Sequence, residues 1–344
     1  MSAFQIEGGF SGIVASSRVR LARNVKGYTY GQQSPEKLKE IADKVWEAVG
    51  AAPAIAGEFD RHQIRPGLAE TQQMVENHII SPALAQRGGW VVVSKDGGAS
   101  IMIGEEDHLR IQVMGSGLCP RECLAEAQRL AALIEHSVPM DFDEKLGYLT
   151  ACPTNLGTGL RVSVMLHLPM LTAAGAMQNV IGWAGRQGCA VRGAFGEGSG
   201  AEGGFYQLSN QVTLGVSEDM LAAKLIDVAA KLIEEEERAR QAVREKDETG
   251  LLDKLCRAAG VLKTARRITT AEALSCLSDV LVGLQMQVLG GVTAQAVCAA
   301  ERAMRPATLT VRAGKDLTPA ERDKLRADLL RREIGDKLAI LACA

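Results

Sequence analysis

The stretch that decides the fold is CPTNLGTGLRVSVMLHL, residues 152–168. It opens with a cysteine and a Gly-rich bend, whose two glycines let the backbone turn before Arg161. From residue 160 the apolar residues alternate with polar ones. Because alternate side chains of a strand point to opposite faces, the pattern predicts a strand with a buried face and a polar face. The buried face holds Leu160, Val162, Val164 and Leu166, and the polar face holds Arg161, Ser163 and His167.

The same alternation recurs in SSRVRLARN (residues 16–24), HLRIQVM (108–114) and AVRG (190–193). Each segment places arginine on the face away from its apolar residues, and none contains lysine. For any single arginine, a solvated sheet face is the better explanation. A rigid fork of donors suits bidentate contact with phosphate oxygens, so the whole set predicts an anion site. The set comprises Arg18, Arg20, Arg110, Arg161 and Arg192.

Strand patterns continue to about Gly215, and beyond Ser217 the sequence reads as helices. We therefore predict an α+β fold, with a sheet packed by helices followed by an all-helical C-terminal domain. The predicted domains are residues 1–235 and 236–344.

Composition excludes several classes of protein. A net charge of −2 gives no global attraction to nucleic acid or an anionic membrane. The first residues, MSAFQIEGGF, carry no signal-peptide pattern, so we expect a cytoplasmic protein whose eight cysteines are thiols, without a protein-held metal site. Residues 280–300 are uncharged, but their Gly-Gly pair and Thr293 predict two buried helices instead of a membrane span.

Two loops carry carboxylates. Glu105, Glu106 and Asp107 lie between two predicted strands, where a connection should expose them. RGAFGEGSGAEGG, residues 192–204, is rich in glycine and contains Glu197 and Glu202. Its GxGxxG spacing is not followed by a helical pattern, which argues against a dinucleotide site. We predict a mobile lid that carries a carboxylate over a bound ligand.

These motifs, in this order between residues 13 and 215, resemble the phosphagen (guanidino) kinase family. The resemblance implies an antiparallel sheet flanked by helices, and ATP with Mg²⁺ carried by its phosphates. It implies that the five arginines clamp the triphosphate and that His78 packs on adenine. Glu106 and Glu197, with Glu105 beside them, would align a guanidinium and accept its proton, while Cys152 positions it. At Gly104 the family usually has asparagine.

Carboxylates are needed because a guanidinium holds its proton up to a pKa above ~12, which leaves no free lone pair for attack on phosphorus. The stretch GYLTACPTNLGTGLRVSVMLHLP, residues 147–169, most resembles the bacterial protein-arginine kinase branch. The sequence also has no counterpart before residue 13 of the helical domain that metabolite kinases carry there. The resemblance thus implies phosphorylation of arginine side chains in proteins. The alternatives are a kinase of free arginine or another small guanidino compound, and a catalytically weakened phosphoarginine-binding adaptor.

RDKLRA, residues 322–327, is similar to the phosphoarginine-sensing motif of that branch. It lies in LTPAERDKLRADLLRREI, residues 317–334, where Thr318 and Glu321 predict a capping box. We expect Leu325, Leu329 and Ile334 to be buried. The resemblance implies an allosteric site made by Arg322, Asp323 and Arg326.

The resemblance also implies partners: protein substrates with exposed arginine, a zinc-binding activator protein, a Clp chaperone-protease that degrades marked clients and a heat-shock transcriptional repressor. We expect a homodimer with no membrane and no direct nucleic-acid contact.

Overall fold

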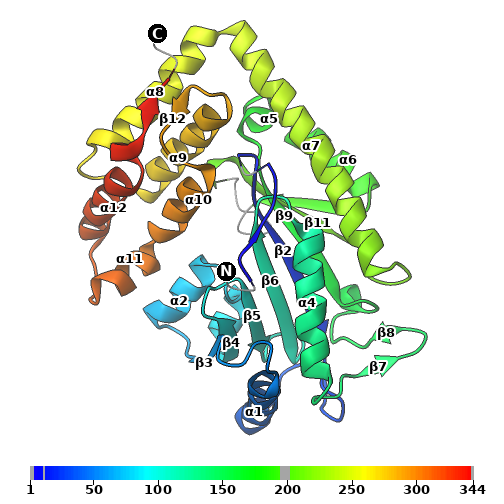
Figure 1. The fold of residues 1–344 in the computed structure, drawn as a ribbon. Helices are drawn as coiled ribbons and strands as arrows, with labels where there is room; N and C mark the ends of the chain where they lie inside the picture. Colours follow the sequence, from blue (N-terminus) through cyan, green and yellow to red (C-terminus); the bar gives the residue numbers. More distant parts are fainter. Residues whose placement is uncertain (1–3, 11, 194–201, 342–344) are drawn as a thin grey trace.

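A central sheet of nine strands organises the part of the chain that the computed structural model describes, residues 4–10, 12–193 and 202–341 (Figure 1). The strand order is β10-β11-β9-β2-β6-β5-β4-β3, all neighbours are antiparallel, and β1 joins β6 in parallel. The strands are β1 (Ile6–Glu7), β2 (Val14–Arg23), β3 (Phe59–Ile64), β4 (Gly89–Ser94), β5 (Ala99–Ile103), β6 (Leu109–Ser116), β9 (Leu160–His167), β10 (Cys189–Gly193) and β11 (Phe205–Asn210).

One face of this sheet is covered by helices and forms the larger core. The apolar positions of the alternating strands, such as Val19, Leu21 and Val162, are fully buried there. The covering helices are α1 (Pro35–Ala51), α4 (Pro120–Glu135), α6 (Met177–Arg186) and α7 (Glu218–Lys246). Ser34 caps α1, since its hydroxyl accepts the Lys37 N–H, and Pro35 occupies the first turn, where a missing N–H does no harm.

The opposite face carries the arginines, and the described helices cover it at its two ends. At one end α2 (Ala69–Glu76) and α3 (Pro82–Arg87) pack on Val91, Val93 and Met102. At the other end Met165 and Phe205 meet helices of the C-terminal part across a small pocket. The polar face therefore opens into clefts between these two covers.

The C-terminal part has its own hydrophobic core and is built almost wholly of helices. The expectation of an all-helical domain needs one correction, because β12 (Leu289–Gly290) pairs with β13 (Ala339–Ile340). Strands of two residues leave no alternating pattern in a sequence. The helices are α8 (Glu248–Thr264), α9 (Thr270–Gln285), α10 (Ala294–Ala303), α11 (Pro306–Ala313), α12 (Pro319–Glu333) and the 3₁₀ turn η3 (Gly335–Lys337).

The predicted domain boundary at 235/236 falls inside α7, which runs unbroken into the junction between the two parts (Figure 1). The larger core extends to Ile233, and the second core includes Leu251 of α8. Between them Glu236 and Arg240 form a buried ion pair, 2.9 Å between Oε1 and Nε. A single helix thus links the two cores.

Shorter elements complete the described chain. They are β7 (Phe142–Asp143), β8 (Gly147–Tyr148), α5 (Pro169–Ala173) and the 3₁₀ turns η1 (Pro153–Asn155) and η2 (Glu202–Gly204). The described cysteines are free thiols.

The alternating segments of the sequence are confirmed as strands, but β3 was not predicted. Only Phe59 and Ile64 are buried in β3, so its sequence FDRHQI lacks an apolar alternation. Residues 280–300 divide between the end of α9, β12 and the start of α10, where Thr293 caps the helix. None of the described helices is long and apolar enough to cross a membrane.

Candidate active site

The five predicted arginines line one cavity of about 260 Å³ on the polar face of the sheet. Strand register explains why they meet: Arg20 of β2 lies opposite Arg161 of β9, and Ala22 lies opposite Arg110 of β6. Arg192 reaches the same cavity from β10. The cavity also contains Glu106, Thr154 and Asn155, so motifs from four separate stretches of sequence converge.

These arginines are held close together, and few acidic side chains of the described residues lie beside them. Burial, followed by Arg110 and Arg161, lowers the pKa of Arg18 to about 10. Burial and then the charge of Arg18 hold the pKa of Arg20 well below its ordinary value. The buried Nε atoms of Arg20 and Arg161 have no hydrogen-bond partner among the described residues. Because buried donors without acceptors are costly, the cavity is suited to a polyanion that supplies both charge and acceptors.

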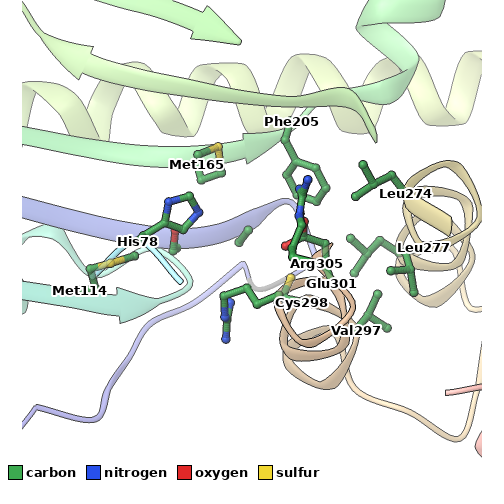
Figure 2. A pocket seen from close by; sticks show the side chains of 14 residues that line it. His78, Met114, Met165, Phe205, Leu274, Leu277, Val297, Cys298, Glu301 and Arg305 are labelled. Carbon is green, nitrogen blue, oxygen red and sulfur yellow. The ribbon is translucent and has the colours of Figure 1, made fainter. Parts of the chain in front are cut away.

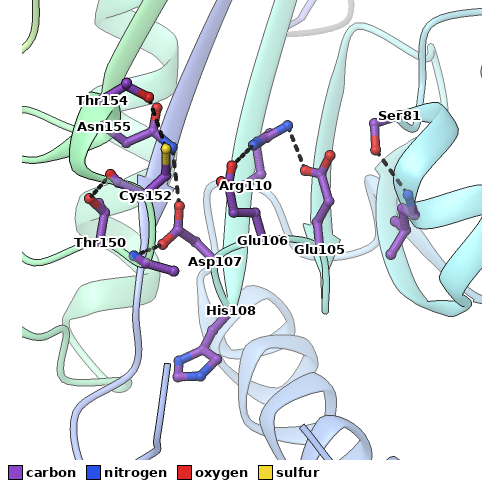
Figure 3. A network of polar contacts seen from close by, with 12 residues as sticks. Ser81, Glu105, Glu106, Asp107, His108, Arg110, Thr150, Cys152, Thr154 and Asn155 are labelled. Atoms are coloured by element: carbon purple, nitrogen blue, oxygen red, sulfur yellow. Dashed lines mark hydrogen bonds and ion pairs between the residues drawn. The ribbon is translucent and has the colours of Figure 1, made fainter. Parts of the chain in front are cut away.

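The acidic turn after β5 is less exposed than predicted, except at Glu106. Glu105 is 6% exposed, and its Oε2 lies 2.6 Å from Nη1 of Arg110. Glu106 is exposed, with its Oε2 3.6 Å from Nη2 of the same arginine (Figure 3). The expectation of a fully exposed turn was wrong for Glu105 and Asp107 because each has polar partners inside the protein. Glu105 therefore orients an arginine, while Glu106 keeps a carboxylate at the cavity.

Asp107, which the sequence analysis named only as part of the acidic turn, supports the Cys152 loop. It is 2% exposed, and its Oδ1 accepts hydrogen bonds from the Ala151 N–H at 2.7 Å and from Asn24 Nδ2 at 2.8 Å. Its Oδ2 accepts from Asn155 Nδ2 at 3.3 Å. Figure 3 shows Asp107 beneath the loop that carries Cys152. The carboxylate thus anchors that loop on both sides of the cysteine.

Cys152 itself is half-buried, and its Sγ lies 3.0 Å from the Thr154 hydroxyl oxygen. The bend that follows requires glycine. Gly157 and Gly159 have φ of +105° and +63°, and an added Cβ would meet backbone oxygens of Thr213 and Ala22 at 2.6 and 2.5 Å. The expected turn into Arg161 is therefore present.

The presence of glycine at position 104 also has a structural reason. Its φ is +94°, and an added Cβ would lie 2.8 Å from Cδ2 of Leu38 on α1. Glycine lets α1 approach the acidic turn closely at this position.

His78 stands in the connection after α2 with a left-handed backbone, φ +58°. It lines a small apolar pocket with Met114, Met165 and Phe205 (Figure 2) and also a cleft of about 1300 Å³ that contains Arg18. Burial, followed by nearby arginines, lowers the pKa of His78 to about 4. A neutral imidazole therefore joins the apolar pocket to the arginine cluster.

Glu197 lies outside the described residues, so its predicted place over the cavity remains a prediction. Among the described residues no group of three or more His, Cys, Asp or Glu side chains is placed to hold a metal ion.

Helix α12 differs from expectation. Arg326 is 1% exposed and donates to Met304 O at 3.1 Å, Ile268 O at 2.9 Å and Asp323 Oδ1 at 2.6 Å. Leu325, predicted to be buried, is 38% exposed. The prediction assumed that an apolar residue fills the core, but three internal acceptors satisfy the guanidinium instead. Arg322 lines the large cleft, so it does not share an open face with Arg326.

Family comparisons agree with both halves of this architecture. The family model described as the ATP:guanido phosphotransferase C-terminal catalytic domain matches residues 41–239. The model described as the Protein-arginine kinase McsB C-terminal domain matches residues 248–339.

Two similar relatives are named protein-arginine kinase. The one from Caldanaerobacter subterraneus subsp. tengcongensis is 38% identical over 332 residues, which cover 94% of this chain and 98% of the relative. The one from Moorella thermoacetica is 41% identical over 329 residues, 93% of each chain.

Solved structures share the fold. Lombricine kinase aligns with a TM-score of 0.55 at 24% identity over 69% of each chain. The duplicated taurocyamine kinase from Schistosoma mansoni, with bound transition state analog components, aligns with a TM-score of 0.53 at 26% identity over 76% of this chain and 38% of its own.

Proposed function

Because the chain belongs to the ATP:guanido phosphotransferase family, we propose that it transfers the γ-phosphoryl group of ATP to arginine side chains of proteins. The observation that supports this most directly is the cluster of five arginines in one cavity beside Glu106 and the Cys152 loop. Relatives that match more than 90% of both chains and are named protein-arginine kinase support the choice of substrate.

The arginine cluster suits the triphosphate of ATP. Five guanidinium groups line the cavity and offer donors to phosphate oxygens. Their charge would stabilise the transferring phosphoryl group. Magnesium would arrive bound to the phosphates. It would neutralise charge on the β- and γ-oxygens.

Adenine fits the apolar pocket beyond His78. Met114, Met165 and Phe205 supply its apolar walls, and the neutral imidazole can pack on the base (Figure 2). This pocket adjoins the cleft that holds Arg18, so the base and the phosphates can bind at the same time.

The substrate guanidinium would lie between Glu106 and the Cys152 loop. A nitrogen of the guanidinium forms a bond to the γ-phosphorus, while the bond from that phosphorus to the β,γ-bridging oxygen breaks and ADP leaves with the electron pair. The nitrogen gives up its proton to a carboxylate, Glu106 or Glu197, as the N–P bond forms. Asp107 keeps the loop in place, which preserves the alignment of the reacting atoms.

We further propose that α12 binds phosphoarginine and that this binding regulates the enzyme. Asp323 is already paired with buried Arg326, so Asp323→Ala would leave that charge without its carboxylate and weaken the fold as well. Arg322→Gln is the cleaner variant, since Arg322 faces the cleft. It should remove the response of the initial rate to added phosphoarginine while basal activity persists. Equal responses in wild type and variant would contradict the sensing role.

Cellular roles follow from the resemblance alone. We propose a cytoplasmic homodimer that works with a zinc-binding activator protein, marks clients for a Clp chaperone-protease and modifies a heat-shock transcriptional repressor.

The test of substrate class is incubation with Mg-ATP and a protein such as casein, followed by mass spectrometry under non-acidic conditions, because the N–P bond is acid-labile. Free arginine is assayed in parallel. Phosphoarginine on casein supports the proposal. Modification of free arginine alone would identify a small-molecule guanidino kinase, and ATP binding without any transfer would identify an adaptor.

A further inference from the structure

Glu76, at the end of α2, joins the catalytic domain to the C-terminal domain. Its Oε1 accepts the backbone N–H of Ala307 at 2.9 Å, and its Oε2 accepts the N–H of Thr308 at 2.8 Å and the hydroxyl of Thr308 at 3.0 Å. These donors form the first turn of α11, so Glu76 acts as its cap from 231 residues away. In Figure 1 α2 and α11 lie side by side.

Glu76 has the chemistry that this position favours. The first N–H groups of a helix have no partner within the helix and carry a partial positive charge. Arg305, which precedes α11, supplies no side-chain cap of its own. A carboxylate satisfies two of these N–H groups by charge-assisted hydrogen bonds, which are stronger than those between neutral groups.

The connection from α10 to α11, which Glu76 caps, forms one wall of the pocket proposed for the nucleotide. Helix α10 and the residues that lead into α11 contribute Glu301, Arg302 and Arg305 to the apolar pocket, opposite His78 (Figure 2). Pro306 and Ala307 line the adjoining cleft with Arg18. The C-terminal domain thus reaches the site proposed for ATP.

The other wall begins two residues after Glu76. His78 adopts left-handed backbone, and its carbonyl accepts a hydrogen bond from Gln112 Nε2 at 2.7 Å. The next carbonyl, of Ile79, accepts from the Ser100 hydroxyl at 2.8 Å. These bonds fix the backbone of the His78 connection to the sheet, and Glu76 fixes its start to the C-terminal domain.

We propose that Glu76 is a positioning residue for ATP, which holds the His78 wall and the α10–α11 wall at the distance that the nucleotide needs. The inference rests on the proposed function, because it takes the pocket to be the nucleotide site. It adds that the C-terminal domain forms part of that site. Glu76 itself touches no reacting group.

The same connection is also held from α12. Arg326 Nε donates to Met304 O at 3.1 Å, three residues before Ala307. The connection from α10 to α11 is therefore hydrogen-bonded to two different elements, to α12 through Arg326 and to α2 through Glu76. A movement of α12 would therefore shift the N-terminus of α11 relative to Glu76.

The test compares Glu76→Gln with Glu70→Gln, an exposed residue on the same helix. Glu76→Gln keeps the shape but replaces one acceptor oxygen by an amide and removes the charge. We expect Mg-ATP to bind about 5-fold or more weakly by calorimetry and KM for ATP to rise equally, with kcat within about twofold of wild type. Glu70→Gln should match wild type in all three measurements. Thr308→Val, which removes one donor to Glu76, should give a smaller change in the same direction. Thr308→Ser, which keeps the hydroxyl, should bind Mg-ATP as wild type does.

A merely structural role would give a different pattern. If Glu76→Gln lowered the unfolding temperature but bound ATP as wild type does, the positioning role would be overturned while the proposed function stood. If wild type itself bound no Mg-ATP, the proposed function would fall, and this inference with it.

Discussion

Arg20 and Arg161 lie directly opposite each other on the antiparallel strands β2 and β9, both with a buried Nε that no described group accepts. Like charges in opposed positions destabilise a sheet. The pair is therefore a cost to the folded protein that a bound polyanion would offset, which connects the stability of the fold to the occupancy of the site.

Arg161→Gln should separate these two effects. The variant relieves repulsion on Arg20 and should stabilise the nucleotide-free protein by about 0.5 kcal/mol. It should also weaken Mg-ATP binding by about 10-fold or more, since a charge-assisted contact is lost. Thermal unfolding with and without Mg-ATP checks both, with exposed Arg238→Gln as control. An undiminished shift of the unfolding temperature on adding ATP would show that Arg161 does not contact the nucleotide.

Glu106→Gln and Glu197→Gln should each reduce turnover by about 10²-fold while Mg-ATP binding persists, as expected for a positioned proton acceptor. Glu106 is exposed at the cavity and lies 3.6 Å from Arg110, so its loss should disturb the arginine cluster little. Initial rates on a protein substrate and calorimetry with Mg-ATP give the two quantities. Near-normal turnover in Glu106→Gln would exclude that residue as the acceptor.

Asp107→Asn should loosen the Cys152 loop. The new amide would place N–H groups against donors from Ala151 and Asn24, which should cost about 1–3 kcal/mol of stability. We expect kcat to fall by about 10-fold through misalignment, with KM for ATP nearly unchanged. Steady-state kinetics and chemical denaturation are compared with Asp60→Asn, an exposed aspartate on β3. Unchanged kcat despite lower stability would make Asp107 purely structural.

His78 should contribute to the pH dependence of stability. Burial lowers its pKa from 6.5 to about 4 in the folded protein. The unfolded chain therefore binds the proton more readily between these values, so the contribution of His78 is present above pH 6.5 and lost as pH falls toward 4. His78→Asn, which tolerates left-handed backbone, should lose less stability between pH 7 and pH 5 than wild type does. Urea midpoints at the two pH values test this, and parallel losses would contradict it.

Local patterns in the sequence were enough to predict the central strands and the face on which their arginines stand. Alternation depends only on the two-residue period of a strand, so Arg18, Arg20, Arg110 and Arg161 could be placed on one face before the register was known. The capping box at Thr318 is equally local and is present in the structure. Strand β3 was not predicted because its sequence is mostly polar and shows no two-residue alternation of apolar and polar residues.

Tertiary structure decided which polar groups are buried and what they hold. Asp107 reads as one acid in an exposed turn, yet its partners come from residues 24, 151 and 155. Arg326 reads as a surface residue of a charged helix, yet its acceptors lie at residues 268 and 304. Glu76 caps a helix 231 residues further on. A side chain's burial depends on whether the fold brings it a partner, and no periodicity along the chain encodes a partner so distant.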